Sequence, residues 1–179
     1  MGEVLGLGLS HYPPLRGTDD AMAAILRNTL KRPDVPETAK DPAGWPAPMR
    51  AEWGEDEGRS AAPRHRAEFV KHARVVRDEL DRFKPDIIVM FGDDQYENFK
   101  EDVVPPFCVY AWEDMQIKPH ERNGQALENI WDEGPEFAVN LKGHPAAAKF
   151  LVRGLLDRKI DMAYSYKPLH YEGLSHAFL

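Results

Sequence analysis

The sequence has little of what defines secreted, membrane and nucleic-acid-binding proteins. Cys108 is the only cysteine among 179 residues, so no internal disulfide can form, which fits a reducing cytosol. No apolar run approaches the roughly 20 residues that a membrane-spanning helix requires, and the first residues lack the basic region of a signal peptide. Lys and Arg number 23 against 30 Asp and Glu, a net charge of -7 that disfavours a general nucleic-acid binder. We therefore expect a cytoplasmic protein that binds neither membranes nor nucleic acids.

Several enzyme motifs are also absent from the sequence. It contains no P-loop, no GxSxG nucleophile elbow and no Cys/His spacing typical of zinc sites. Gly6 and Gly8 form only the first part of a dinucleotide-binding fingerprint, because the third glycine and the following helix are missing. Cys108 lies inside a predicted strand, where packing is a better interpretation than a nucleophilic role.

Apolar runs alternate with helical patterns along the rest of the chain. The clearest periodicity lies in residues 64–83, where apolar residues recur every three or four positions: Phe69, Ala73, Val76, Leu80 and Phe83. We expect helices at 18–31, 64–83 and 145–158, a short helix from Tyr96, and strands at 4–9, 86–91, 107–111, 137–141 and 160–166. This alternation predicts an α/β fold, a single domain over 1–179 with a mostly parallel central sheet flanked by helices.

Residues 33–63 have a different character from the rest. Their prolines preclude a long regular element: Pro33, Pro36, Pro42, Pro46, Pro48 and Pro63. Trp45 and Trp53 argue against disorder, because disordered segments are poor in such residues. We expect an irregular, proline-rich excursion that serves as a lid or as a subunit contact.

Three polar clusters follow predicted strands and indicate a functional site. His11 follows the first strand, Asp93, Asp94 and Gln95 follow the strand at 86–91, and the segment from His170 to His176 follows the last. In open α/β sheets ligands bind beyond the carboxyl ends of the strands. If these strands are parallel and adjacent, the three clusters meet at one edge of the sheet.

Each of these residues also has a structural interpretation. His11 could be a loop histidine bonded to backbone, although its place before two prolines favours a ligand or catalytic role. One of Asp93 and Asp94 is expected to cap the helix at Tyr96, which leaves the other for a metal, a substrate or a histidine. The spacing does not decide whether His170 or His176 faces the site. The remaining histidines receive no functional role, and capping a helix start is the better interpretation for the last of them: His65, His72, His120 and His144.

At these positions the chain resembles the class III extradiol ring-cleavage dioxygenases of the protocatechuate 4,5-dioxygenase type. The matching pieces are Gly-Leu-Ser-His11, Pro85-Asp-Ile-Ile-Val-Met-Phe-Gly-Asp-Asp94, Lys142-Gly-His-Pro145 and the segment 173–178. The resemblance implies a mononuclear non-haem Fe(II) held by two histidines and a carboxylate. It also implies a catechol-like aromatic diol that is cleaved with O2 next to its hydroxyls, and association with a second copy or a partner subunit.

The resemblance also implies roles for particular residues. His11 corresponds to the first iron ligand and His176 to the histidine near substrate and O2, with His170 the alternative catalytic residue. Gln95 stands where the family has its second histidine ligand; a Gln carbonyl is a weaker donor, and Asp94 could substitute for it. The family's carboxylate ligand lies beyond residue 179, so we expect the N-terminal portion of a longer protein. The alternatives are a non-catalytic, metal-deficient relative or subunit and a metal-assisted hydrolase.

Overall fold

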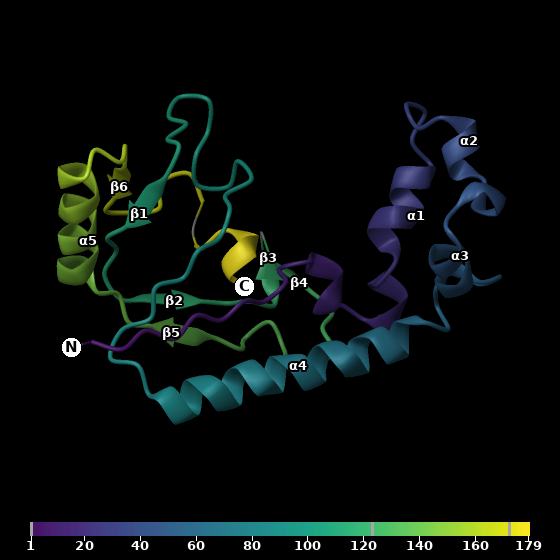
Figure 1. The fold of residues 1–179 in the computed structure, drawn as a ribbon, viewed down its shortest axis with the longest axis horizontal. Helices are drawn as coiled ribbons and strands as arrows, with labels where there is room; N and C mark the ends of the chain where they lie inside the picture. The colour runs from purple at the N-terminus through teal and green to yellow at the C-terminus, as the bar shows by residue number, and fades with distance from the viewer. Residues whose placement is uncertain (1, 123, 172) are drawn as a thin grey trace. The chain divides into compact units, whose positions relative to one another are not determined.

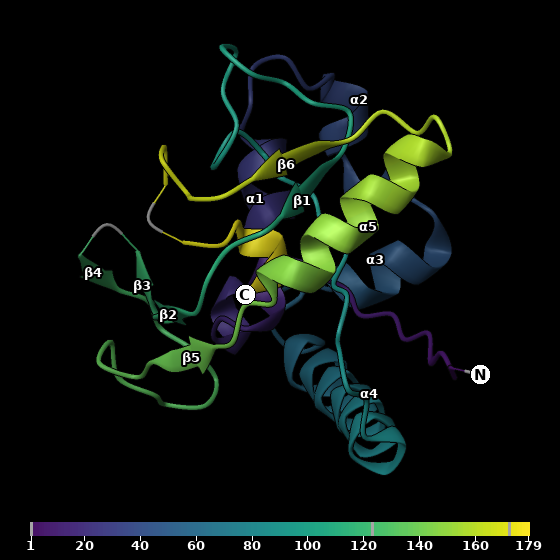
Figure 2. The same cartoon turned by 90° about the vertical axis from the view of Figure 1, so that its left-hand side faces the viewer.

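The computed structural model describes residues 2–122, 124–171 and 173–179, and the chain divides into two compact units. The first unit comprises Met1–Ile88 and Glu128–Glu133, and the second comprises Val89–Leu127 and Gly134–Leu179. Figures 1 and 2 show the ribbon of both units. The single domain over 1–179 stays a prediction.

The first unit is built from helices. Its α-helices are α1 (Ala24–Leu30), α2 (Glu37–Lys40), α3 (Ala47–Trp53) and α4 (Ala62–Phe83), and its 3-10 helices are Pro13–Leu15, Asp19–Ala21 and Pro42–Gly44. The helix predicted at 18–31 is divided into a 3-10 turn and α1. The backbone of Ala23, with φ -97 and ψ 11, departs from α-helical angles, so the regular ladder of hydrogen bonds begins only at Ala24.

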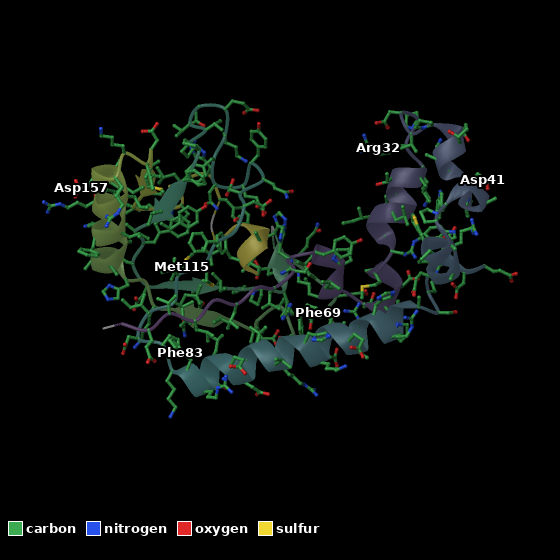
Figure 3. All side chains as sticks on the ribbon, in the orientation of Figure 1. Arg32, Asp41, Phe69, Phe83, Met115 and Asp157 are labelled. Atoms are coloured by element: carbon green, nitrogen blue, oxygen red, sulfur yellow. The ribbon has the colours of Figure 1, made fainter. Side chains whose placement is uncertain are left out.

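Helix α4 confirms the strongest pattern in the sequence. It begins two residues before the predicted start, with Pro63 in its first turn, where the missing backbone N–H removes no helical hydrogen bond. The five apolar residues of the predicted stripe are all partly buried, and two of them, Phe69 and Phe83, are labelled in Figure 3. Arg66 anchors the helix, because its buried guanidinium donates to Asp19 Oδ1 at 2.7 Å and to the carbonyl of Leu15.

The proline-rich segment 33–63 forms short helices joined by turns. Trp45 is buried, its indole N–H donates to the carbonyl of Ala39 at 2.7 Å, and its ring meets that of Trp53 edge to face at 5.3 Å. Pro46 ends the preceding turn and stands as N-cap of α3. The two tryptophans thus form a small apolar centre within this proline-rich segment.

The second unit combines short strands with one helix. Strand β1 (Cys108–Tyr110) pairs in parallel with β6 (Ala163–Ser165), while β2 (Met115–Ile117) pairs with β5 (Val139–Leu141) and β3 (Glu121–Arg122) with β4 (Gln125–Ala126), both antiparallel. Helix α5 (Pro145–Asp157) packs against β1, and the 3-10 helix His176–Phe178 lies close to the C-terminus. The predicted helix at 145–158 and strands at 107–111, 137–141 and 160–166 are confirmed, with shorter strands than expected.

The interior of the second unit is aromatic. The rings of Tyr110 and Trp112 stack at 4.1 Å and 5°, and Phe99 and Phe178 approach Tyr110 at 6.1 and 6.2 Å. The indole N–H of Trp112 donates to Ser165 Oγ at 3.0 Å, so its polar atom is satisfied where the ring is buried. None of the helices in the described parts of the chain is long and apolar enough to span a membrane.

The predicted mostly parallel central sheet is wrong for the described residues, whose strands form two-stranded pairs only. Residues 4–9 and 87–91 belong to no strand and no helix. Their side chains are largely exposed, up to 94% for Val4 and for Phe91. Continuous apolar sequence favours burial, but a strand also requires a neighbouring backbone, and no described segment pairs with these two. The mixed α/β character is confirmed, with β1 and β6 as its one parallel pair among the described strands.

Candidate functional site

In the second unit, the segment after Phe91 packs against the C-terminal segment that contains His176. Gly92 makes this approach possible, because a Cβ atom placed there would lie 2.8 Å from Phe178 Cζ and 3.2 Å from the Cβ of Ala177. Leu174 and Ser175 are buried at the contact, Ser175 completely. Two of the three polar clusters predicted from the sequence are thereby brought together.

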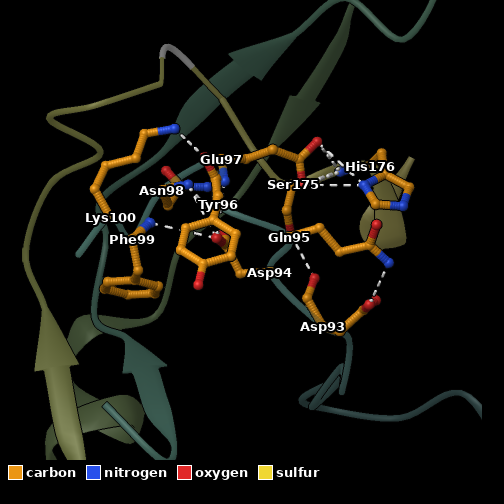
Figure 4. A network of polar contacts seen from close by, with 10 residues as sticks. All are labelled: Asp93, Asp94, Gln95, Tyr96, Glu97, Asn98, Phe99, Lys100, Ser175 and His176. Atoms are coloured by element: carbon orange, nitrogen blue, oxygen red, sulfur yellow. Dashed lines mark hydrogen bonds and ion pairs between the residues drawn. The ribbon is translucent and has the colours of Figure 1, made fainter. Parts of the chain in front are cut away.

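Asp94 organises the loop that follows. Its Oδ1 accepts from the backbone N–H of Glu97 at 3.0 Å and of Phe99 at 3.3 Å, and its Oδ2 accepts from that of Asn98 at 2.9 Å (Figure 4). Only the bond from Glu97, three positions on, has the spacing of a helix N-cap. The predicted helix from Tyr96 is nevertheless wrong, because Tyr96 has φ +61, in the left-handed region, and the loop forms bends. Of the two aspartates, Asp94 accepts the backbone N–H groups of this loop, but no helix follows for it to cap.

Asp93 and Gln95 hold one another and the C-terminal segment. The Gln95 side-chain amide donates to Asp93 Oδ2 at 2.8 Å, and the backbone carbonyl of Asp93 accepts from Ser175 Oγ at 3.0 Å. Figure 4 shows the two side chains turned toward each other beside His176. The amide of Gln95 is thus engaged with a neighbouring carboxylate.

His176 is held by a buried carboxylate. Its Nδ1 lies 3.1 and 3.0 Å from the two carboxylate oxygens of Glu97, and its backbone N–H donates to the same carboxylate at 3.1 Å. Glu97 is only 9% exposed, and the side chain of His176 is 18% exposed. Sequence analysis missed Glu97, because an acidic residue in a polar loop is usually solvated and no pattern marks this one as buried.

The other C-terminal histidine has a different environment. The side chain of His170 is 35% exposed, and its Nε2 lies 3.7 Å from Asp102 Oδ2, a longer ion pair at the surface. His144 accepts from the backbone N–H of Ala147 at 3.3 Å at the start of α5, which confirms its predicted capping role. Of the two histidines in the C-terminal segment, His176 is therefore the one that contacts the polar cluster of residues 93–97.

Burial and a nearby carboxylate keep two further groups protonated. Burial raises the pKa of Cys108 to about 11, with the charge of Asp94 adding to the effect. The pKa of Tyr110 is raised strongly by the same two causes. A thiol that stays protonated at neutral pH is a poor nucleophile, in agreement with the predicted packing role of Cys108.

The described residues of the second unit do not form an Fe(II) centre by themselves. Within residues 2–122, 124–171 and 173–179, no three His, Cys, Asp or Glu side chains form a group that could hold a metal ion. The carboxylate of Asp94 accepts backbone N–H groups, and the amide of Gln95 contacts Asp93. His11 belongs to the first unit, where its ring is exposed, and its role as a metal ligand stays a prediction together with those of Asp94 and Gln95.

Comparison with known proteins finds partial similarity to ring-cleaving dioxygenases. The chain is 30% identical over 100 residues to 2,3-dihydroxyphenylpropionate/2,3-dihydroxicinnamic acid 1,2-dioxygenase 2 of Pseudomonas putida, covering 56% of the chain and 27% of the relative. It is 35% identical over 99 residues to the corresponding 1,2-dioxygenase of a Rhodococcus species, covering 55% and 26%. With the enzyme of Comamonas testosteroni it shares 30% over 108 residues, covering 60% and 29%.

These matches span just over a quarter of the length of the relatives. No family model matches the chain, and no solved structure matches it. The predicted relation to the class III extradiol dioxygenases is therefore confirmed as a distant similarity that covers about half of the chain.

Proposed function

We propose that this chain contributes part of the active site of an extradiol-type dioxygenase that cleaves a catechol-like aromatic ring with O2. The similarity to 2,3-dihydroxyphenylpropionate dioxygenases supports the reaction class and the aromatic diol as substrate. The observation that carries the proposal is the packing of the His176 segment against residues 93–97. Two of the sequence pieces on which the family resemblance depends thus form one partly buried polar cluster.

The chemistry assigned to this chain is proton transfer. A catechol becomes a good electron donor only after losing a proton, and an imidazole held beside the diol can accept it. His176 is the proposed base, because the cluster restrains its ring, whereas His170 lies more exposed at the surface. The family resemblance implies Fe(II) as cofactor, and the described residues of the second unit form no group of three metal-binding side chains by themselves.

Anaerobic titration of the purified chain with Fe(II) and then with 2,3-dihydroxyphenylpropionate tests this function. We expect calorimetry to detect diol binding, with a visible charge-transfer band once Fe(II) is present. His176→Ala should weaken diol binding or its deprotonation, and His170→Ala should leave both unchanged. Metal binding without a diol complex would contradict the proposal and favour a metal-assisted hydrolase.

A second candidate is a metal-deficient relative that keeps the family fold without its catalysis. Gln95 at the position of the family's second histidine favours it, as does the engagement of Asp94 with backbone N–H groups. Failure to bind either Fe(II) or the diol in the same titration would support this candidate and overturn the dioxygenase.

A further inference from the structure

We infer that Glu97 is a positioning residue for His176, which it holds in one tautomer with Nδ1 protonated and the basic lone pair on Nε2. The inference deepens the proposed function and rests on it only for the use of the ring as a base. The contacts that carry it lie within the second unit.

The first argument is the hydrogen-bonding chemistry of the pair. An ionised carboxylate only accepts hydrogen bonds, and Nδ1 of His176 lies 3.0 Å from Glu97 Oε2 and 3.1 Å from Oε1. Nδ1 must therefore carry the hydrogen. In a neutral imidazole one nitrogen donates and the other accepts, so the lone pair is on Nε2.

The second argument is that Glu97 holds two parts of the same residue. The backbone N–H of His176 donates to the carboxylate at 3.1 Å, in addition to the ring contact. A carboxylate that binds both the main chain and the ring fixes the side-chain torsions as well as the tautomer. Figure 4 shows both contacts converging on Glu97.

The third argument is that Glu97 is itself held. Its backbone N–H donates to Asp94 at 3.0 Å, and Ser175, next to His176, donates to the carbonyl of Asp93 at 3.0 Å. Burial of Glu97 removes competing water, which strengthens hydrogen bonds to the carboxylate. The cluster thus has the arrangement in which a second residue orients a catalytic imidazole.

The consequence concerns which nitrogen faces the chemistry. With Nδ1 bonded to Glu97, only Nε2 can accept a proton from the aromatic diol. A ring released from Glu97 would distribute its hydrogen over both nitrogens and could rotate. Loss of the carboxylate therefore lowers the proportion of molecules in which Nε2 of His176 is oriented and unprotonated, although His176 itself remains.

The test is nitrogen NMR of the full chain labelled with 15N-histidine, with the pH raised until the ring of His176 gives the signals of the neutral form. We expect Nε2 of His176 to resonate as an unprotonated nitrogen in the wild type. In Glu97→Ala the ratio of the Nδ1–H to the Nε2–H tautomer should fall about tenfold or more, as expected when a hydrogen bond to a charged acceptor is lost.

Three variants complete the test. Glu97→Gln keeps the size of the side chain but can donate or accept, so both tautomers should appear; it carries the test if Glu97→Ala does not fold. Glu97→Asp keeps the carboxylate and should partly restore the wild-type signal. Glu101→Gln, an exposed acidic residue four positions later, is the matched control and should change nothing.

The outcomes separate this inference from the proposed function. An unchanged His176 tautomer in folded Glu97→Ala and Glu97→Gln would overturn the positioning role, whether or not the chain binds a diol. The expected tautomer change in a chain that binds neither Fe(II) nor a diol would support the positioning role and overturn the dioxygenase.

Discussion

The two histidines of the C-terminal segment, six positions apart, show how differently the fold treats similar residues. His176 has its ring and backbone bonded to the buried Glu97, while His170 approaches the exposed Asp102 at 3.7 Å. Both follow the same strand, and their spacing alone does not distinguish them. The distinction comes from residues 92–97. They contact His176, and none of the described contacts joins them to His170.

Removing each acidic partner should give the largest contrast. Glu97→Ala leaves two donors of His176 without their acceptor in a buried place, so we expect the free energy of unfolding to fall by about 2 kcal/mol. Asp102→Ala removes a long surface pair and should change it by less than about 0.5 kcal/mol. Denaturation in urea measures both, and equal effects would contradict the distinction between the two histidines.

Adding a methyl group at Gly92 should disturb His176 selectively. Gly92→Ala places a Cβ 2.8 Å from the ring of Phe178, and overpacking of this kind costs about 1–3 kcal/mol. We expect lower stability and a displaced His176 resonance, with the resonance of His170 retained. The matched control is Gly124→Ala, at a glycine with open space but φ +74, which should cost stability without moving His176. A wild-type His176 signal in Gly92→Ala would show that the segment adapts elsewhere.

Loosening the Asp94 loop should have a smaller effect. Asp94→Ala removes the acceptor for three backbone N–H groups in a partly exposed loop, and we expect a cost of about 1 kcal/mol, the net value of a typical hydrogen bond. Asp94→Asn keeps one oxygen at the same place and should recover most of the stability. If Asp94→Asn is as destabilised as Asp94→Ala, the charge of Asp94 matters more than its hydrogen bonds.

The smallest effect on folding is expected at Gln95. Gln95→His should change the free energy of unfolding by no more than about 0.5 kcal/mol, because the residue lies in an exposed part of the loop. We expect it to raise the affinity for Fe(II), since imidazole is a better donor than an amide oxygen. Titration with Fe(II) checks this, and an affinity equal to that of the wild type would mean that position 95 does not face a metal.

Local patterns predicted helices α4 and α5 and three of the strands. The apolar stripe of 64–83 and Pro145 at a helix start depend on near neighbours, and both elements form within two residues of the expected bounds. The runs at 87–91 and 107–111 are both apolar, yet only the second contains a strand. Its partner β6 lies more than fifty residues away in sequence, and no local pattern encodes the presence or absence of such a partner.

The sequence predicted which segments form the candidate site, but it did not predict the contacts between their side chains. His176 and the aspartates followed from strand ends and from family resemblance, and the structure brings their segments together. Glu97 did not follow, because its burial depends on the left-handed turn at Tyr96 and on the packing permitted by Gly92. A left-handed tyrosine is unusual enough that sequence alone gives no reason to expect it.

The tight fit of the Phe178 ring over Gly92 makes these two positions compensating partners. A side chain at position 92 fits only if the residue at position 178 is smaller than phenylalanine. A smaller residue at position 178 leaves room for alanine at position 92. Among natural variants of this protein the two positions should therefore covary. A selection for folded clones from a library randomised at both should recover alanine at 92 only alongside substitutes smaller than phenylalanine.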